Sequence, residues 1–126
     1  MTTLTDAGKE LQATALAKAL AGGSYVLLDG DGERIVRAVF PAAFEVRKVG
    51  DDYELSFGAF AVAKVERMGR ARSFQAIPAG SDAPLLAGRI GPTLGKGVAL
   101  AMDDQDLFQN MDFEVEGFSH LVRFTP

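Results

Sequence analysis

The sequence predicts a mainly β fold, an antiparallel β-sandwich or jelly roll with one N-terminal α-helix. Three observations indicate this class. Apolar residues repeat at helical spacing only before Gly23, and beyond it they alternate with polar residues in short runs. Turn signals separate these runs at intervals of about 8 to 12 residues, which is typical of sandwiches. No later segment has a helical pattern, so a parallel sheet built from strand-helix-strand units is excluded.

The first element is an amphipathic helix from Thr5 to Leu20. Thr3 or Thr5 can cap its start, and Gly22-Gly23 ends it because glycine enters the left-handed region without steric cost. We expect the helix to pack on its own domain or on a neighbouring subunit. Its apolar positions are Leu4, Leu11, Ala15, Leu16, Ala19 and Leu20.

The chain divides into residues 1–23, the helix with its glycine terminator, and residues 24–126, a single β-domain. The alternation is clear where Phe44 and Val46 are interleaved with Glu45 and Arg47. The expected strands are Tyr25 to Leu28, Arg34 to Phe40, Phe44 to Val49, Tyr53 to Phe57, Ala59 to Glu66, Arg72 to Ile77, Leu85 to Ile90, Val98 to Met102, Met111 to Glu116 and Phe118 to Phe124.

Composition excludes several classes of function. The 126 residues carry a net charge of −4, with a pI near 4.9, so a general affinity for nucleic acid is not expected. Cysteine is absent, which removes disulfides and thiolate chemistry. The N-terminus has no signal-peptide pattern, and no uncharged run approaches the ~20 residues of a membrane helix. We therefore expect a protein made in the cytoplasm, with no membrane partner.

The stretch "LDGDGER" raises the question of a calcium site. Counted from Asp29, the sixth residue is Arg34 and the twelfth is Phe40, where an EF-hand needs glycine and glutamate. Two Asp-Gly steps between alternating runs instead predict a tight hairpin whose central residues have positive φ. A metal site of another type is the alternative at this position, and overall we expect no metal and no cofactor. The stretch "GPTLGKG" also lacks the spacing of a phosphate loop.

Catalytic patterns are missing as well. His120, the only histidine, shares one strand face with Phe118, Val122 and Phe124, which indicates a core or interface position. No serine lies in a nucleophile-elbow pattern, and the acidic pairs fall in turn-like sequence. We expect no enzymatic activity. A carbohydrate-binding module is an alternative for a small sandwich, but only Tyr25 and Tyr53, with no tryptophan, are available as stacking residues.

One dense basic group lies in "AKVERMGRAR", with Met68-Gly69 at an expected hairpin tip. The group comprises Lys64, Arg67, Arg70 and Arg72. A solvated hairpin is the simplest interpretation, and docking against an acidic partner or an anion is the alternative. The acidic run Asp103-Asp104-Gln105-Asp106 is its counterpart, and the two loops can pair if copies pack side by side.

The order of these features resembles the small virion-associated proteins of tailed bacteriophages. The segments that carry the resemblance are "LTDAGKELQATALAKALAGG", "SYVLLDGDG", "LSFGAFAVAKVER", "APLLAGRIG" and "MDFEVEGFSHLVRF". The resemblance implies a β-sandwich in which Ala59 to Glu66 and Arg72 to Ile77 form a hairpin and Gly88 precedes the next strand. The segment Pro92 to Asn110 departs from that pattern, and no catalytic residue is implied.

The function that this resemblance implies is structural. We expect a multi-copy capsid decoration (cement) protein of the virion, made in the host bacterium, and a tail-associated or fibre-attachment protein is the alternative. The expected partners are major capsid or tail subunits and further copies of the chain. Apolar helix residues would bury against the partner while charged loops set the register. The candidate docking residues are Leu11, Leu16, Leu20, Arg67, Arg70 and Arg72.

Overall fold

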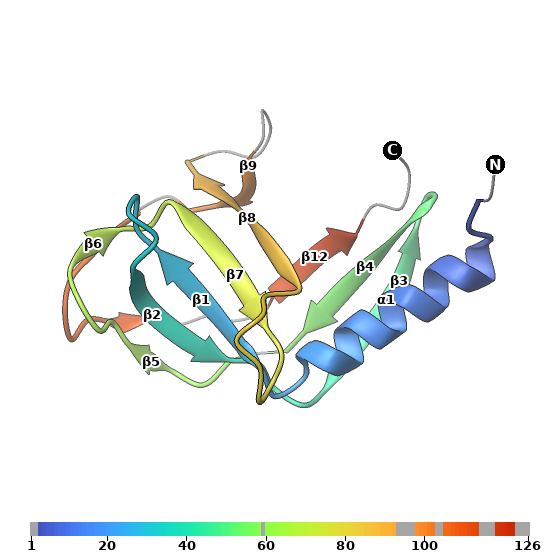
Figure 1. Cartoon of the computed structure of the whole chain (residues 1–126), viewed down its shortest axis with the longest axis horizontal. Helices are drawn as coiled ribbons and strands as arrows, with labels where there is room; N and C mark the ends of the chain where they lie inside the picture. Colours follow the sequence, from blue (N-terminus) through green and yellow to red (C-terminus); the bar gives the residue numbers. More distant parts are fainter. Residues whose placement is uncertain (1–2, 59, 93–97, 103–104, 114–117, 123–126) are drawn as a thin grey trace.

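The computed structural model describes residues 3–58, 60–92, 98–102, 105–113 and 118–122, with the backbone alone for 98–101 and 118–122. Within this part the chain forms a single helix followed by strands in mainly antiparallel sheets, so the expected mainly β class with an N-terminal helix is confirmed (Figure 1). The elements are α1 (Asp6–Leu20), β1 (Ser24–Leu28), β2 (Arg34–Val39), β3 (Phe44–Val49), β4 (Asp52–Phe57), β5 (Ala63–Lys64), β6 (Gly69–Arg70), β7 (Ser73–Ile77), β8 (Leu86–Gly91), β9 (Val98–Ala101), β10 (Asp106–Leu107), β11 (Asp112–Phe113) and β12 (Phe118–Val122).

The strands form four sheets, none of which closes on itself in the described residues. The largest has the order β2-β1-β7-β8-β9, and a three-stranded sheet has the order β12-β4-β3. Two short ladders, β10-β6 and β11-β5, complete the set. Figure 1 shows α1 with β3 and β4 at one end of the molecule and β5 and β6 at the other.

One pair departs from the antiparallel expectation. β8 and β9 run parallel, with Arg89 opposite Val98, although only residues 92–97 lie between the two strands. Parallel neighbours usually need a crossover of a dozen or more residues. Here the register shifts after Arg89, so the ladder covers only the end of β8.

The helix begins and ends where its capping residues predict. The Thr5 hydroxyl accepts a hydrogen bond from the Gly8 amide at 3.2 Å, which satisfies one of the unpaired donors of the first turn. Gly22 has φ +76°, the left-handed conformation that stops a helix, and the Gly23 amide donates to the Leu20 carbonyl.

The first two hairpins follow from their turn residues. Between β1 and β2 the Gly32 amide donates to the Asp29 carbonyl at 3.1 Å, and Gly32 has φ +80°. The connection is therefore a three-residue loop with one glycine in the left-handed conformation. The predicted hairpin is confirmed. The expected positive φ at both central residues is wrong, because only Gly32 has it. Between β3 and β4, Gly50 has φ +63° at the first central position of a two-residue turn, as in type II′.

The core joins the two larger sheets through an aromatic cluster. Phe40, directly after β2, is 1% exposed. Its ring centroid lies 4.7 Å from that of Phe57 on β4, 5.0 Å from Phe60 and 6.0 Å from Tyr25 on β1. Tyr25 also stacks on Phe74 of β7 at 5.2 Å. Phe40 is therefore the residue through which the five-stranded and three-stranded sheets share one core.

The strand expected from Ala59 to Glu66 is wrong in extent and in pairing. Only Ala63–Lys64 is a strand in the described part of this range, and it pairs with β11, whereas β7 pairs with β1 and β8. The implied hairpin with Arg72 to Ile77 is therefore absent. Parts of the other late strands, and residues 103–104 of the acidic run, lie outside the described residues.

Gly69 explains why a hairpin tip was wrongly expected at Met68-Gly69. It lies in β6 and not at a tip, and a Cβ added there would come within 3.1 Å of the Ile35 side chain. A glycine inside a strand is typical of close approach between packed segments, as here. The same residue type marks turns, so the sequence does not separate the two roles.

Candidate functional site

The Asp29 carboxylate stabilises the β1–β2 hairpin in which it lies. Its Oδ1 accepts hydrogen bonds from the backbone amides of Asp31 at 2.9 Å and Glu33 at 3.0 Å, and its Oδ2 pairs with Arg67. The bond from the Glu33 amide, together with the Asp31 amide and the Arg67 charge, lowers the pKa of Asp29. Within the described residues no group of three or more acidic or histidine side chains is placed to bind a metal ion.

Three residues of the basic group pair with acidic residues of the same chain. Arg70 pairs with Asp106 at 3.2 Å, Lys64 pairs with Asp112, and Arg67 pairs with Asp29. The β6–β10 and β5–β11 ladders bring the acidic segment alongside the basic one. The expected pairing of these two loops between copies is therefore replaced, for Arg70 and Asp106, by a pairing within one copy.

The Arg70–Asp106 and Lys64–Asp112 pairs are exposed and carry little stability. The side chains of Arg70 and Asp106 are 47% and 60% exposed, and such pairs contribute about 0 to 1 kcal/mol each. Arg72 is exposed as well. The candidate docking arginines thus lie at the surface, but two of the three already have acidic partners.

An apolar surface lies between these ion pairs. In the β6–β10 ladder Arg70 and Asp106 face solvent, and Leu107, opposite Gly69, turns into the core. One step further, Met68 and Phe108 face solvent again, 66% and 56% exposed. We call Met68, Phe108 and the neighbouring Met111 the apolar tip.

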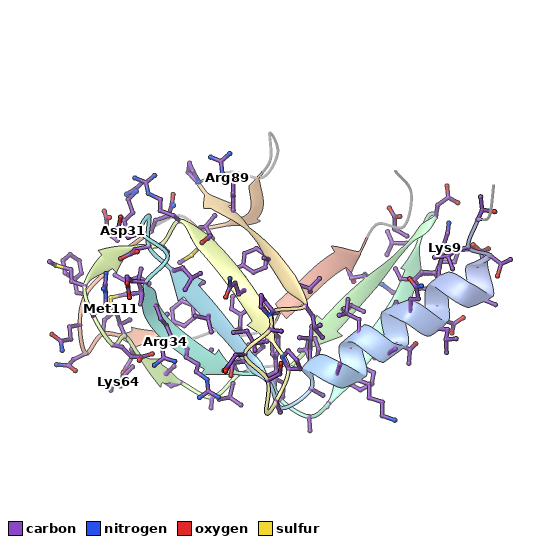
Figure 2. The ribbon with its side chains drawn as sticks, in the orientation of Figure 1. Lys9, Asp31, Arg34, Lys64, Arg89 and Met111 are labelled. Carbon is purple, nitrogen blue, oxygen red and sulfur yellow. The ribbon has the colours of Figure 1, made fainter. Side chains whose placement is uncertain are left out.

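Met111 completes the apolar tip from the turn that follows β10. It is 40% exposed, and its amide donates to the Phe108 carbonyl at 3.1 Å. Figure 2 shows Met111 and Lys64 together at the end of the molecule remote from Lys9 on α1. Sequence reasoning missed this surface, because Phe108 lies in the segment Pro92 to Asn110, to which no strand other than Val98 to Met102 was assigned. No local signal pointed to it, because Met68 and Phe108 become neighbours only through the β6–β10 ladder.

The helix packs on its own domain. Leu20 is fully buried, which makes it unavailable to a partner in this conformation, and Leu16 is partly buried against the core. Leu11, in contrast, is 71% exposed. Of the three candidate docking residues on the helix, Leu11 is exposed, Leu16 is partly exposed and Leu20 is buried.

Contacts with the β3–β4 hairpin fix the first turn of the helix. Lys48 donates to the Asp6 carboxylate at 2.9 Å, and the Tyr53 hydroxyl donates to the Asp6 carbonyl at 3.2 Å. The hydrogen bond and charge of Lys48 lower the pKa of Asp6, and Asp6 in turn raises the pKa of Lys48. Lys9 adds a bond to the Asp51 carbonyl. The helix is therefore anchored at both ends, by charge at Asp6 and by burial at Leu20.

The residues considered for catalysis and sugar binding take other positions. His120 lies opposite Leu55 in the β12–β4 pairing, and its side chain lies outside the described part. Tyr25 and Tyr53 are 3% and 4% exposed, so neither forms an exposed stacking platform. Burial also raises the pKa of Tyr25.

Two open hollows lie elsewhere on the surface. One, of about 260 Å³, borders the start of β3 and the end of β4 and is lined by Ala43, Phe44, Glu45, Ser56, Phe57 and Gly58. The other, of about 180 Å³, lies between β2 and residues 77–82 and includes Arg34 and Arg37. Arg34 is held at 2.7 Å by Glu66.

Comparison with known proteins found no similar protein. No protein-family model, curated protein or solved structure matches the chain. Among the described residues, the helix falls short of the length and apolar character needed to cross a membrane.

Proposed function

We propose that this chain is a non-enzymatic structural protein of a bacteriophage virion, of β-sandwich type, most specifically a multi-copy capsid decoration protein. The proposal rests on the resemblance of its segment order to virion-associated proteins and on the apolar tip. In this proposal the chain binds the surfaces of other proteins and catalyses no reaction.

The apolar tip is the observation that carries the proposal. Met68, Phe108 and Met111 gather three large apolar side chains at one end of the molecule. The ion pairs Arg70–Asp106 and Lys64–Asp112 lie beside them, on the β6–β10 and β5–β11 ladders. An apolar centre with a polar rim is the usual anatomy of a protein interface, and Met and aromatic side chains are enriched at such centres. Methionine also adapts to an irregular partner surface.

The test is cosedimentation with phage particles. The chain is mixed with shells assembled from the major capsid protein of the phage that encodes it and, separately, with tails of that phage. Pelleting with shells supports decoration, and pelleting only with tails would transfer the role to the tail. A chain that remains in the supernatant with both would overturn the proposal.

A pair of variants tests the surface itself. Phe108→Ser removes the centre of the apolar tip and is expected to weaken binding at least about tenfold, as for a central interface residue. Leu85→Ser is the matched control, because Leu85 is similarly apolar and 44% exposed but lies outside the tip. Equal binding by both variants would show that the tip is not the docking surface, and Leu11→Ser then tests the helix in the same assay.

A further inference from the structure

In the part of the chain that the structure describes, the strand β3 has one open edge. It pairs with β4 on one side, and no described strand lies on the other. Because Val49 and Asp52 close a two-residue turn, residues 45, 47 and 49 exchange hydrogen bonds with β4. The backbone N–H and C=O groups of Phe44, Val46 and Lys48 therefore point away from the sheet.

This edge carries part of the usual protection. Natural edge strands are shielded by proline, bulges, charged side chains or a covering helix or loop, and β3 has the charged residues Glu45, Arg47 and Lys48. β3 contains no proline, its register with β4 is regular, and the charge of Lys48 is engaged by Asp6 at 2.9 Å. The strand is six residues long, enough for a substantial ladder.

We infer that β3 pairs antiparallel with β3 of a second copy, with Val46 opposite Val46 across a two-fold axis. The residues that then exchange hydrogen bonds are Phe44, Val46 and Lys48, whose backbone groups are directed outward. The two three-stranded sheets become one sheet of order β12-β4-β3-β3-β4-β12. This inference does not depend on the phage partner proposed above.

Charge selects this register. With Val46 opposite Val46, Glu45 of each copy lies opposite Arg47 of the other. The adjacent registers that keep the same hydrogen-bonding residues place Glu45 opposite Glu45 or Arg47 opposite Arg47. Opposite charges directly across a ladder are stabilising and like charges are destabilising. Only the Val46-centred register therefore complements both charged positions.

The side chains of the monomer are arranged for this second pairing. Glu45 is exposed, and its neighbour on β4 is the uncharged Ser56. Arg47 bonds Glu54 at 2.6 Å but remains 72% exposed, and a guanidinium has donors for a second carboxylate. The paired sheet would carry a continuous row of Glu54, Arg47 and the second copy's Glu45.

Apolar surface is covered in the same register. Val49, 41% exposed, comes opposite Ala43 of the other copy, at the hollow of about 260 Å³ beside Phe44 and Phe57. The two helices lie on the same side of the joint sheet, because the axis is perpendicular to it. Since α1 packs on both β3 and β4, strand spacing of about 4.8 Å places the helix axes roughly 10 Å apart, the ordinary distance for packed helices.

Sedimentation equilibrium over a range of protein concentrations tests the inference, with circular dichroism as the check of folding. The wild-type chain is expected to form dimers. Lys48→Pro removes an outward N–H that has no role within the sheet, and it should weaken the dimer roughly tenfold or more. Lys48→Ala is the matched control: it loses the same ion pair with Asp6 but keeps the N–H and should dimerise. A monomeric wild-type chain, or equal dimerisation by the two variants, would overturn the inference.

Mixing two charge variants tests the register. Glu45→Arg places arginine opposite arginine in its own dimer, and Arg47→Glu places glutamate opposite glutamate, so each alone should be mainly monomeric. Mixed together they present only opposite charges, and the heterodimer should form. Failure of the mixture to associate while both variants are folded would refute the Val46-centred register. If Arg47→Glu does not fold, because it also faces Glu54, the comparison of Lys48→Pro with Lys48→Ala decides the inference.

Discussion

Replacing Phe40 should cost more stability than almost any other single change, because its ring joins the two larger sheets. Phe40 is 1% exposed and contacts the rings of Tyr25, Phe57 and Phe60 at centroid distances of 6.0, 4.7 and 5.0 Å. Truncating a buried Phe to Ala costs about 3 to 5 kcal/mol, and each ring pair adds about 0.5 to 1.5 kcal/mol beyond area burial. With three ring partners, we expect Phe40→Ala to lower the free energy of unfolding by about 5 kcal/mol.

Urea unfolding followed by circular dichroism measures this effect. Phe108→Ala is the matched control, since the same ring at 56% exposure should cost less than about 1 kcal/mol. Phe40→Leu keeps most of the volume and loses the ring pairs, so it should cost about 1 to 3 kcal/mol, and it remains measurable if Phe40→Ala is unfolded. A cost below about 1.5 kcal/mol for a folded Phe40→Ala protein, or equal costs at positions 40 and 108, would refute the role of Phe40.

Two further predictions concern the backbone and pH. Gly23→Ala should destabilise the fold by more than about 2 kcal/mol, because the new Cβ would lie 2.2 Å from the Ile77 carbonyl oxygen. Thermal melting measures this, with Gly58→Ala as the control, because a Cβ at Gly58 meets nothing within 4 Å. Equal melting temperatures for the two variants would contradict the prediction. The bond from the Glu33 amide lowers the pKa of Asp29, so its ionised form contributes stability that is present above about pH 4 and is lost as pH falls through the folded pKa. Asp29→Asn should therefore melt below the wild type at pH 7 and approach it at pH 3, and a constant difference at both values would exclude this linkage.

Local signals made the first half of the chain predictable. Thr5 and Gly22 set the helix ends through short-range capping, and the two hairpins have turn residues that specify them. In each case the residues that determine the structure lie within a few positions of one another. The β3 range, Phe44–Val49, was predicted to the residue for this reason.

The second half of the chain depends on pairing between strands far apart in the sequence, for which the sequence contains no local signal. β6 and β10 contribute two residues each, too few for a visible period, and they join residues 36 positions apart. The sequence identified the basic group but not the β6–β10 and β5–β11 ladders that bring Asp106 and Asp112 to it. The apolar tip was invisible for the same reason, because Met68 and Phe108 become neighbours only when the ladder forms.

Because the ribosome synthesises the chain from its N-terminus, the residues of the apolar tip emerge at different times. Met68 leaves the ribosome well before Phe108 and Met111, and the Lys64–Asp112 contact that borders the tip spans 48 positions. Domains generally fold as units during synthesis, so β10 and β11 must emerge before their ladders with β6 and β5 can form. A nascent polypeptide therefore already holds the residues of the helix and of the first hairpins at a stage when the apolar tip cannot yet form.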